Sequence, residues 1–151
     1  MNSRKWILVF SVVLLLAGGT AIYMFAVRER VAPPPVPELT GKWVQAGADP
    51  SSDWYFIAEI TDELIEVWKY RPSNGEQVLY WTGTFTPPPE GATGDYTWES
   101  INDIAKAKTS MFASREEKKS FTYSKDGRIS FITTASLLQM GYSLERPGAS
   151  K

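Results

Sequence analysis

The sequence predicts an all-β domain, an antiparallel up-and-down meander of about eight or nine short strands, preceded by one N-terminal transmembrane helix. Three observations lead to this prediction. Apolar and polar residues alternate with a period of two beyond residue 40, turn-forming residues separate the alternating segments, and one long uncharged stretch lies near the N-terminus. The length of 151 residues leaves room for one ordinary domain.

Residues 6–27 carry no charged side chain, and 22 residues of helix at about 1.5 Å each suffice to cross a hydrocarbon core. Arg4, Lys5 and the terminal amine precede the stretch, whereas residues 28–30 contribute a net single positive charge. The positive-inside rule therefore predicts a cell-membrane protein with N-in/C-out orientation, residues 1–5 being cytoplasmic. The alternative is a cleaved secretory signal at the small residues Gly19 and Ala21, which would release a secreted domain.

Residues 28–38 form the expected link between the anchor and the domain. Four prolines fall between residues 31 and 37. Because proline fixes φ and lacks a backbone donor, we expect an extended and stiff spacer. A polyproline docking site for a partner is the alternative interpretation of the same residues.

The β domain is predicted at residues 39–147, followed by a tail at 148–151. The expected strands are 42–46, 54–61, 64–70, 79–85, 96–99, 110–114, 120–124, 129–133 and 140–145. Turn-forming residues separate them at 62–63, 72–75, 87–91, 116–117 and 126–127. Only 101–108 and 134–138 are suited to a helical turn.

So many strands must protect their edges, so we expect a small closed barrel, or alternatively a β-sandwich. One set of aromatic residues falls on alternate positions that would face inward: Trp43, Phe56, Trp68, Trp81, Trp98, Phe112, Phe121 and Phe131. Burial of such rings would stabilise a domain that has no disulfide. The same rings could instead line a concave site for an apolar or sugar-like ligand.

The first strand opens with Gly41-Lys42-Trp43. This Gly-x-Trp pattern resembles the signature that opens lipocalins and the wider calycin group, whose members are up-and-down antiparallel barrels. The resemblance implies that Trp43 closes one end of the barrel and that Arg146, late in the last strand, packs on it. The sequence is similar to the compact lipocalin-like domains that occur in bacterial envelope proteins.

The residue inventory excludes several kinds of chemistry. The chain has no Cys and no His, which excludes a Ser-His-Asp triad, a cysteine nucleophile and the usual zinc sites. The carboxylate pairs at 62–63 and 116–117 are expected in exposed turns, which are unsuited to general acid catalysis. The acidic loop 49–53 lacks EF-hand spacing, so we interpret it as an Asx-type turn rather than a calcium site. We therefore expect no enzyme activity, no cofactor and no metal.

Charge separates the two parts of the chain. Residues 1–37 hold four of the 16 basic and one of the 17 acidic residues, which leaves 12 and 16, a net −4, for the rest. This sign argues against nucleic acid as a partner, and the pair Lys118-Lys119 is interpreted as a solvated turn. We expect an anchored domain for non-catalytic binding outside the membrane, with another envelope protein as partner and the proline-rich loop 86–94 as a protruding surface. The alternatives are an apolar or glycan ligand-binding protein and an accessory, prophage-type exclusion factor or inhibitor.

Overall fold

The computed structural model describes residues 35–36, 38–135 and 138–149. Of the two compact units into which the chain divides, Met1–Ala32 lies outside these residues and Pro33–Lys151 contains the sheet. The expected transmembrane helix at 6–27 and most of the spacer therefore lie outside the described residues. Over the part of the chain that is described, no helix has the length and apolar character needed to span a membrane.

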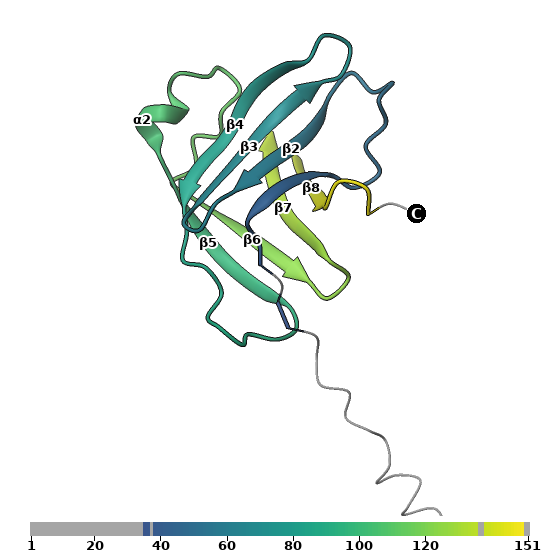
Figure 1. Cartoon of the computed structure of the whole chain (residues 1–151). Helices are drawn as coiled ribbons and strands as arrows, with labels where there is room; N and C mark the ends of the chain where they lie inside the picture. The colour runs from purple at the N-terminus through teal and green to yellow at the C-terminus, as the bar shows by residue number, and fades with distance from the viewer. Residues whose placement is uncertain (1–34, 37, 136–137, 150–151) are drawn as a thin grey trace, which may run out of the picture. The chain divides into compact units, whose positions relative to one another are not determined.

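Eight strands form one closed antiparallel barrel, so the expected β class is confirmed and the barrel rather than the sandwich is observed (Figure 1). Each strand pairs with the next along the chain, and β8 returns to β1 through the pairs Val44–Glu145 and Gln45–Leu144. The strands are β1 (Gly41–Gln45), β2 (Tyr55–Ile60), β3 (Leu64–Arg71), β4 (Glu76–Thr84), β5 (Tyr96–Asn102), β6 (Lys118–Ser124), β7 (Arg128–Ala135) and β8 (Leu138–Glu145).

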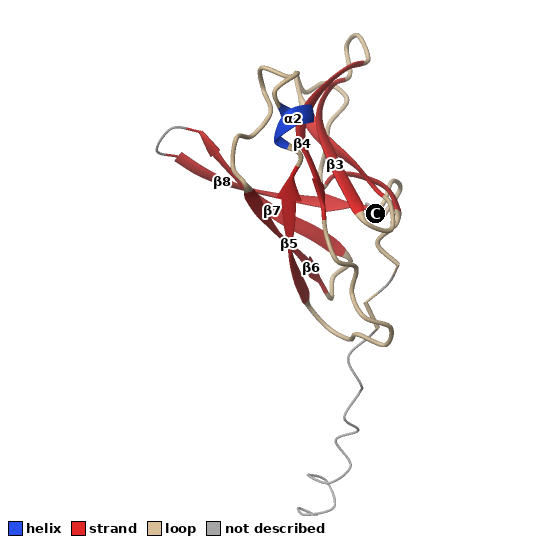
Figure 2. Cartoon of the chain, turned by 90° about the vertical axis from the view of Figure 1, so that its left-hand side faces the viewer, coloured by secondary structure: helices blue, strands red, loops and turns tan. Residues whose placement is uncertain are grey.

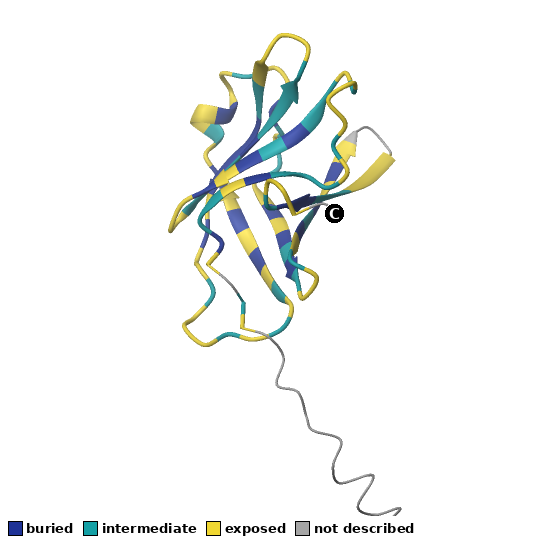
Figure 3. Cartoon of the chain, turned by 45° about the vertical axis from the view of Figure 1, so that its right-hand side comes forward, coloured by how far each residue is buried: buried dark blue, intermediate teal, exposed yellow. Residues whose placement is uncertain are grey.

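The period-two pattern of the sequence appears directly as alternating burial along the strands (Figure 3). In β5, Trp98, Ser100 and Asn102 are buried, whereas the residues between them are exposed. Successive side chains of a strand point to opposite faces, so one set fills the interior and the other meets solvent. The core accordingly contains inward residues of all eight strands, together with Leu39 and Phe85, which flank β1 and β4.

The structure differs from the sequence prediction at residues 110–114, where an expected strand is instead a loop with turns. Hydroxyl groups there bond locally, since Ser110 Oγ accepts from the Phe112 N–H at 3.3 Å. Such local bonds compete with strand pairing. The short helix α2 (Ile104–Ala107) begins just before, capped by Asp103, whose carboxylate accepts from the Lys106 N–H at 3.0 Å. The expected helical turn within 101–108 is thus confirmed.

This segment, residues 103–117, covers the edge of β4 where β5 departs from it. Strands β4 and β5 share only two register pairs, Gly83–Asn102 and Thr84–Ile101. Beyond them, the Ser114 N–H donates to the Tyr80 carbonyl at 2.8 Å and the Ser110 hydroxyl to the Leu79 carbonyl at 2.7 Å. Backbone groups of β4 that would otherwise lack a partner are satisfied in this way.

The up-and-down order gives the barrel two distinct ends. Residues 38–40, the β2–β3 turn at 61–63 and the β4–β5 loop at 85–95 lie at the end where the chain enters, which we call the entry end. Residues 46–54, 72–75 and 103–117 lie at the opposite, distal end. There β7 and β8 extend together as a long hairpin beyond the neighbouring strands (Figure 2).

Candidate functional site

The interior of the barrel is occupied by aromatic rings packed on one another. Trp43, Phe56, Trp81, Trp98, Phe121 and Phe131 are all buried. Trp98 stacks on Phe121 with ring centres 5.7 Å apart, and Phe131 contacts Phe121 at 5.5 Å. Phe56 packs on Phe131 with ring centres 5.4 Å apart. Side chains therefore fill this interior, as is usual for small barrels.

Two of the aromatic residues expected inside lie elsewhere. Phe112 is 56% exposed in the loop after α2, so the inward prediction is wrong for this residue. Trp68 is half-buried and pairs across the sheet with Ile57 on the outer face, because its strand neighbours Ile65 and Val67 occupy the interior. With Ile57 and Val44, Trp68 lines an outer hollow of about 450 Å³.

The residues of the Gly-x-Trp pattern and the late arginine come together at the entry end. The Arg146 guanidinium lies over the ring of Trp43, 4.2 Å from its centre, and donates to the carbonyls of Thr40 at 2.9 Å and Glu38 at 2.7 Å. The Trp43 indole N–H donates to the Leu39 carbonyl at 2.8 Å. These contacts fix residues 38–40 across the end of the barrel.

Gly41 makes this approach possible. Its φ of 116° lies in the region that favours glycine, and a Cβ atom there would stand 2.8 Å from Arg146 Nη1. A larger residue would therefore displace the guanidinium from Trp43. The glycine of the pattern acts by leaving space for the arginine.

A buried polar cluster lies toward the distal end, where the sequence predicts a solvated turn. Lys119 is in β6 with its side chain only 3% exposed, so the solvated prediction is wrong for this lysine. Its ammonium group pairs with Glu116, donates to the Ile132 carbonyl at 3.0 Å and lies over the rings of Tyr80 and Trp81. The ion pair and the ring faces together compensate for the burial of the charge.

The groups of this cluster shift the pKa values of Glu116 and Tyr80. Partial burial favours a higher pKa for Glu116, but the hydrogen bond and charge of Lys119, with hydroxyl bonds from Ser114 and Thr134, outweigh it and lower that pKa. Burial, with a smaller contribution from the nearby Glu116 charge, raises the pKa of Tyr80 to about 12. At neutral pH these shifts favour an ionised Glu116 carboxylate paired with Lys119 and a neutral Tyr80 phenol.

The distal end also holds a small cavity of about 180 Å³ lined by Trp54, Lys69 and Phe112, among others. The Lys69 ammonium lies 5.9 Å from the centre of the Phe56 ring and 5.8 Å from that of Phe112. Arg71 lies over Trp54 at 4.1 Å and pairs with Glu76. This arrangement combines cations with aromatic faces at the mouth of the barrel.

The acidic loop 49–53 behaves as a turn. The Asp49 carboxylate accepts from the Ser51 N–H at 2.8 Å, and this backbone bond is the main reason that the pKa of Asp49 is lowered. The geometry agrees with the expected Asx-type turn. Across the described ranges, no group of three or more acidic side chains gathers in a way that could hold a metal ion.

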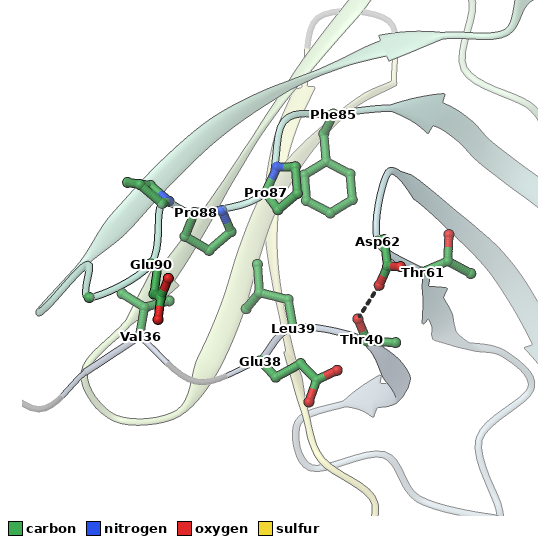
Figure 4. Close-up of a pocket in the computed structure, with 12 residues that line it drawn as sticks. Val36, Glu38, Leu39, Thr40, Thr61, Asp62, Phe85, Pro87, Pro88 and Glu90 are labelled. Carbon is green, nitrogen blue, oxygen red and sulfur yellow. Dashed lines mark hydrogen bonds between the residues drawn. The ribbon is translucent and has the colours of Figure 1, made fainter.

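A groove with a volume of about 450 Å³ lies at the entry end (Figure 4). Three parts of the chain form it: Val36 with residues 38–40, the β2–β3 turn and the proline-rich loop. Leu39 lies at its centre, with Phe85 and Pro87 on one side and Val36 and Glu90 on another. We call this feature the proline groove. Its lining residues are Val36, Glu38, Leu39, Thr40, Thr61, Asp62, Phe85, Pro87, Pro88, Pro89, Glu90 and Gly91.

The proline loop is fixed to the incoming chain. The Val36 N–H donates to the Ala92 carbonyl at 2.8 Å, and Pro35 forms a bridge with Thr93. Thr40 Oγ1 contacts the Asp62 carboxylate at 3.5 Å, which links the first segment to the β2–β3 turn. Together with the Arg146 bonds to the Glu38 and Thr40 carbonyls, these contacts hold all three sides of the groove in place.

The sequence indicates only one part of this groove. Three consecutive prolines predict a stiff loop, but nothing near them identifies Leu39 or Asp62 as neighbours. The fold of the barrel places Leu39 and Asp62 beside the prolines, because the start of β1, the β2–β3 turn and the β4–β5 loop all lie at the entry end.

The closed eight-stranded meander is consistent with the architecture that the lipocalin resemblance implies. Comparison of the chain with protein-family models, with curated proteins and with solved structures found no match.

Proposed function

We propose that this protein is a non-catalytic binding protein whose barrel docks a partner protein in the proline groove. The observation that carries the proposal is an open, apolar groove of about 450 Å³ whose three sides are fixed by the fold. Apolar grooves are recurring docking sites for short segments of partner proteins.

The rigidity of the groove favours binding. Pro87, Pro88 and Pro89 restrict the backbone of one wall, and the Val36–Ala92 bond fixes that wall against the incoming chain. A surface that is already ordered loses little conformational entropy when a partner binds. The filled aromatic interior also supports this proposal. Because side chains occupy the interior, a partner would bind at the surface or the ends of the barrel.

The cellular setting forms part of the same proposal. Residues 6–27 would anchor the chain in the cell membrane with N-in/C-out orientation, and residues 28–38 would space the barrel from it. The partner would be another component of the bacterial envelope. We further assign the barrel to a compact lipocalin-like type, and the Trp43–Arg146 contact supports this assignment.

The test compares two triple variants of the full-length tagged chain. P87S/P88S/P89S softens the groove wall, whereas P50S/P72S/P147S removes three prolines from other loops as a matched control. Each is purified from membranes after crosslinking, and recovered partners are compared with those of the wild type. We expect the first variant to lose a partner that the second retains. Equal partner sets in all three proteins would contradict docking in the groove.

A second candidate is binding of an apolar ligand that carries an anionic group. The observation that favours it is the distal cavity, where Lys69 lies beside the rings of Phe56 and Phe112. Titration with laurate or a glycan fragment, followed by tryptophan fluorescence, tests this candidate because Trp54 lines the cavity. A laurate response that Lys69→Met abolishes would support it, and no response to either probe would exclude both ligands.

A further inference from the structure

The chemistry of the proline groove indicates what kind of partner segment it takes, an inference that rests on the proposed function. The floor comes from Leu39 and Phe85, which are 4% and 8% exposed and thus fixed by the core beneath them. Phe85 packs on Trp98 with ring centres 5.6 Å apart. A rigid apolar floor favours an apolar side chain as its occupant, because burial of that side chain removes apolar surface from water.

The wall of three prolines adds to this preference. Proline has no backbone N–H, so Pro87, Pro88 and Pro89 present ring carbons but no main-chain donor to an occupant. Aromatic and aliphatic side chains can pack on such rings, as they do where proline-rich segments meet aromatic grooves. The wall and floor together therefore select for shape and apolar area.

The rim of the groove is acidic. Glu38, Asp62 and Glu90 line it, and no Lys or Arg is among the lining residues. Within the part of the chain that the structure describes, none of the three carboxylates has a basic nitrogen within 4.0 Å. Arg146 is the cation bonded to lining residues, but it donates to the carbonyls of Glu38 and Thr40 and lies on Trp43. Even with this charge counted, the rim is net negative.

We infer that the groove takes a short segment of the partner protein in which a large apolar side chain is flanked by lysine or arginine. The apolar side chain would lie on Leu39 and Phe85, and the flanking cations would reach the rim carboxylates. The same rim disfavours acidic peptides and anionic lipid surfaces through like-charge repulsion. Exposed ion pairs are individually weak, so the three carboxylates together should change affinity by about tenfold.

The experiment measures binding of labelled hexapeptides to the full chain in neutral detergent micelles by fluorescence anisotropy. The basic apolar probe is Gly-Lys-Phe-Leu-Lys-Gly. In a neutral and an acidic version glutamine and glutamate replace both lysines, and in a polar version serines replace Phe-Leu. Empty micelles control for binding to detergent. The protein variants are E38Q/D62N/E90Q and the matched D53N/E59Q/E117Q, which removes three exposed carboxylates that do not line the groove.

We expect the basic apolar peptide to bind wild type and the matched control alike and to bind E38Q/D62N/E90Q about tenfold more weakly. Raising the salt concentration from about 0.05 to 0.3 M should reduce that difference, because exposed charges are screened. The polar and acidic versions should bind weakly to all proteins.

The two levels of the proposal fail in different ways. Equal affinity of wild type for the basic, neutral and acidic versions would overturn the basic-segment inference and leave the groove as a docking site. No binding of the basic apolar peptide at millimolar concentration would overturn the inference as well. If, in addition, P87S/P88S/P89S retained every partner of the wild type, docking in the groove would itself be excluded.

Discussion

The Arg146 guanidinium stacks on Trp43 at 4.2 Å and at the same time donates to the carbonyls of Thr40 and Glu38. This contact joins the end of the last strand to the start of the first. The contact lies beside the β1–β8 pairing, which is the weaker of the two pairings of β1 because it has only two register pairs. One side chain therefore supports barrel closure and positions residues 38–40, which form one side of the proline groove.

We predict that Arg146→Lys destabilises the barrel by about 2 kcal/mol, because lysine keeps the charge but loses the planar group that bonds two carbonyls and stacks on a ring. The control is Arg115→Lys, since Arg115 is exposed and makes one long bond of 3.4 Å to Ser110. Urea unfolding monitored by circular dichroism measures both. Equal midpoints for the two variants would show that the Trp43 contact adds no stability.

A matched pair of glycines tests the close packing between β4 and β5. A Cβ atom on Gly83 would stand 2.5 Å from the Ile101 carbonyl oxygen, so Gly83→Ala must move backbone and should cost about 3 kcal/mol or more. Gly141, also in a strand, has no atom within 4 Å of such a position, and Gly141→Ala should change stability by less than about 1 kcal/mol. Thermal unfolding of both variants measures this difference. Similar melting temperatures would contradict the close packing of Gly83 against β5.

Two buried tryptophans, Trp81 and Trp98, differ in the polar contacts that they make. Trp81 Nε1 donates to Ser100 Oγ at 3.0 Å, whereas the buried Trp98 Nε1 has no partner among the residues that the structure describes. Trp81→Phe removes the donor, leaves the Ser100 hydroxyl buried and weakens the contact of the ring with the Lys119 ammonium, so we expect it to cost about 1–2 kcal/mol more than Trp98→Phe. Urea denaturation curves of the two variants give this difference. A larger cost for Trp98→Phe would refute the role assigned to the Ser100 bond.

The raised pKa of Tyr80 predicts a loss of stability at high pH. Burial raises this pKa to about 12 from the ordinary value of 10.0, so the folded state favours the protonated phenol. The contribution is fully present below pH 10 and is lost as the pH rises towards about 12. Comparing the urea midpoints of wild type and Tyr80→Phe between pH 9 and 12 isolates the effect. The midpoint of the wild type should fall more steeply, and parallel curves would count against it.

Eight of the nine expected strands could be predicted, because apolar and polar residues alternate along a strand wherever one of its faces is buried. The ninth, at residues 110–114, looks extended but is a loop. The hydroxyls of Ser110 and Ser114 accept from N–H groups two residues on, and the Ser110 hydroxyl also donates to the Leu79 carbonyl of β4. The face of Trp68 could not be assigned from sequence, since 64–71 offers two apolar sets, one with Leu64 and one with Ile65. Only pairing with β2 selects Ile65 as inward.

The lysine at 119 was open to prediction from the sequence, whereas the groove was not. Lys119 lies two residues before Phe121 and four before Tyr123, so continued alternation places it on their inward face. A lysine at an inward position interrupts the apolar pattern. The burial of Lys119 is explained only by its contacts with Glu116 and the Tyr80 ring. The groove joins Leu39, Asp62 and Pro88 from separate segments, a juxtaposition that depends on the closure of the whole barrel.

Site-specific photo-crosslinking of the full chain in the cells that produce it tests docking in the proline groove most directly. A benzophenone amino acid replaces Pro88 on the groove wall in one protein and Ser73, in the exposed distal β3–β4 turn, in another. We predict a crosslinked partner protein from position 88 only, with a yield that falls when Glu38, Asp62 and Glu90 are neutralised. The same adducts from both positions, or no adduct from position 88, would contradict docking in the groove.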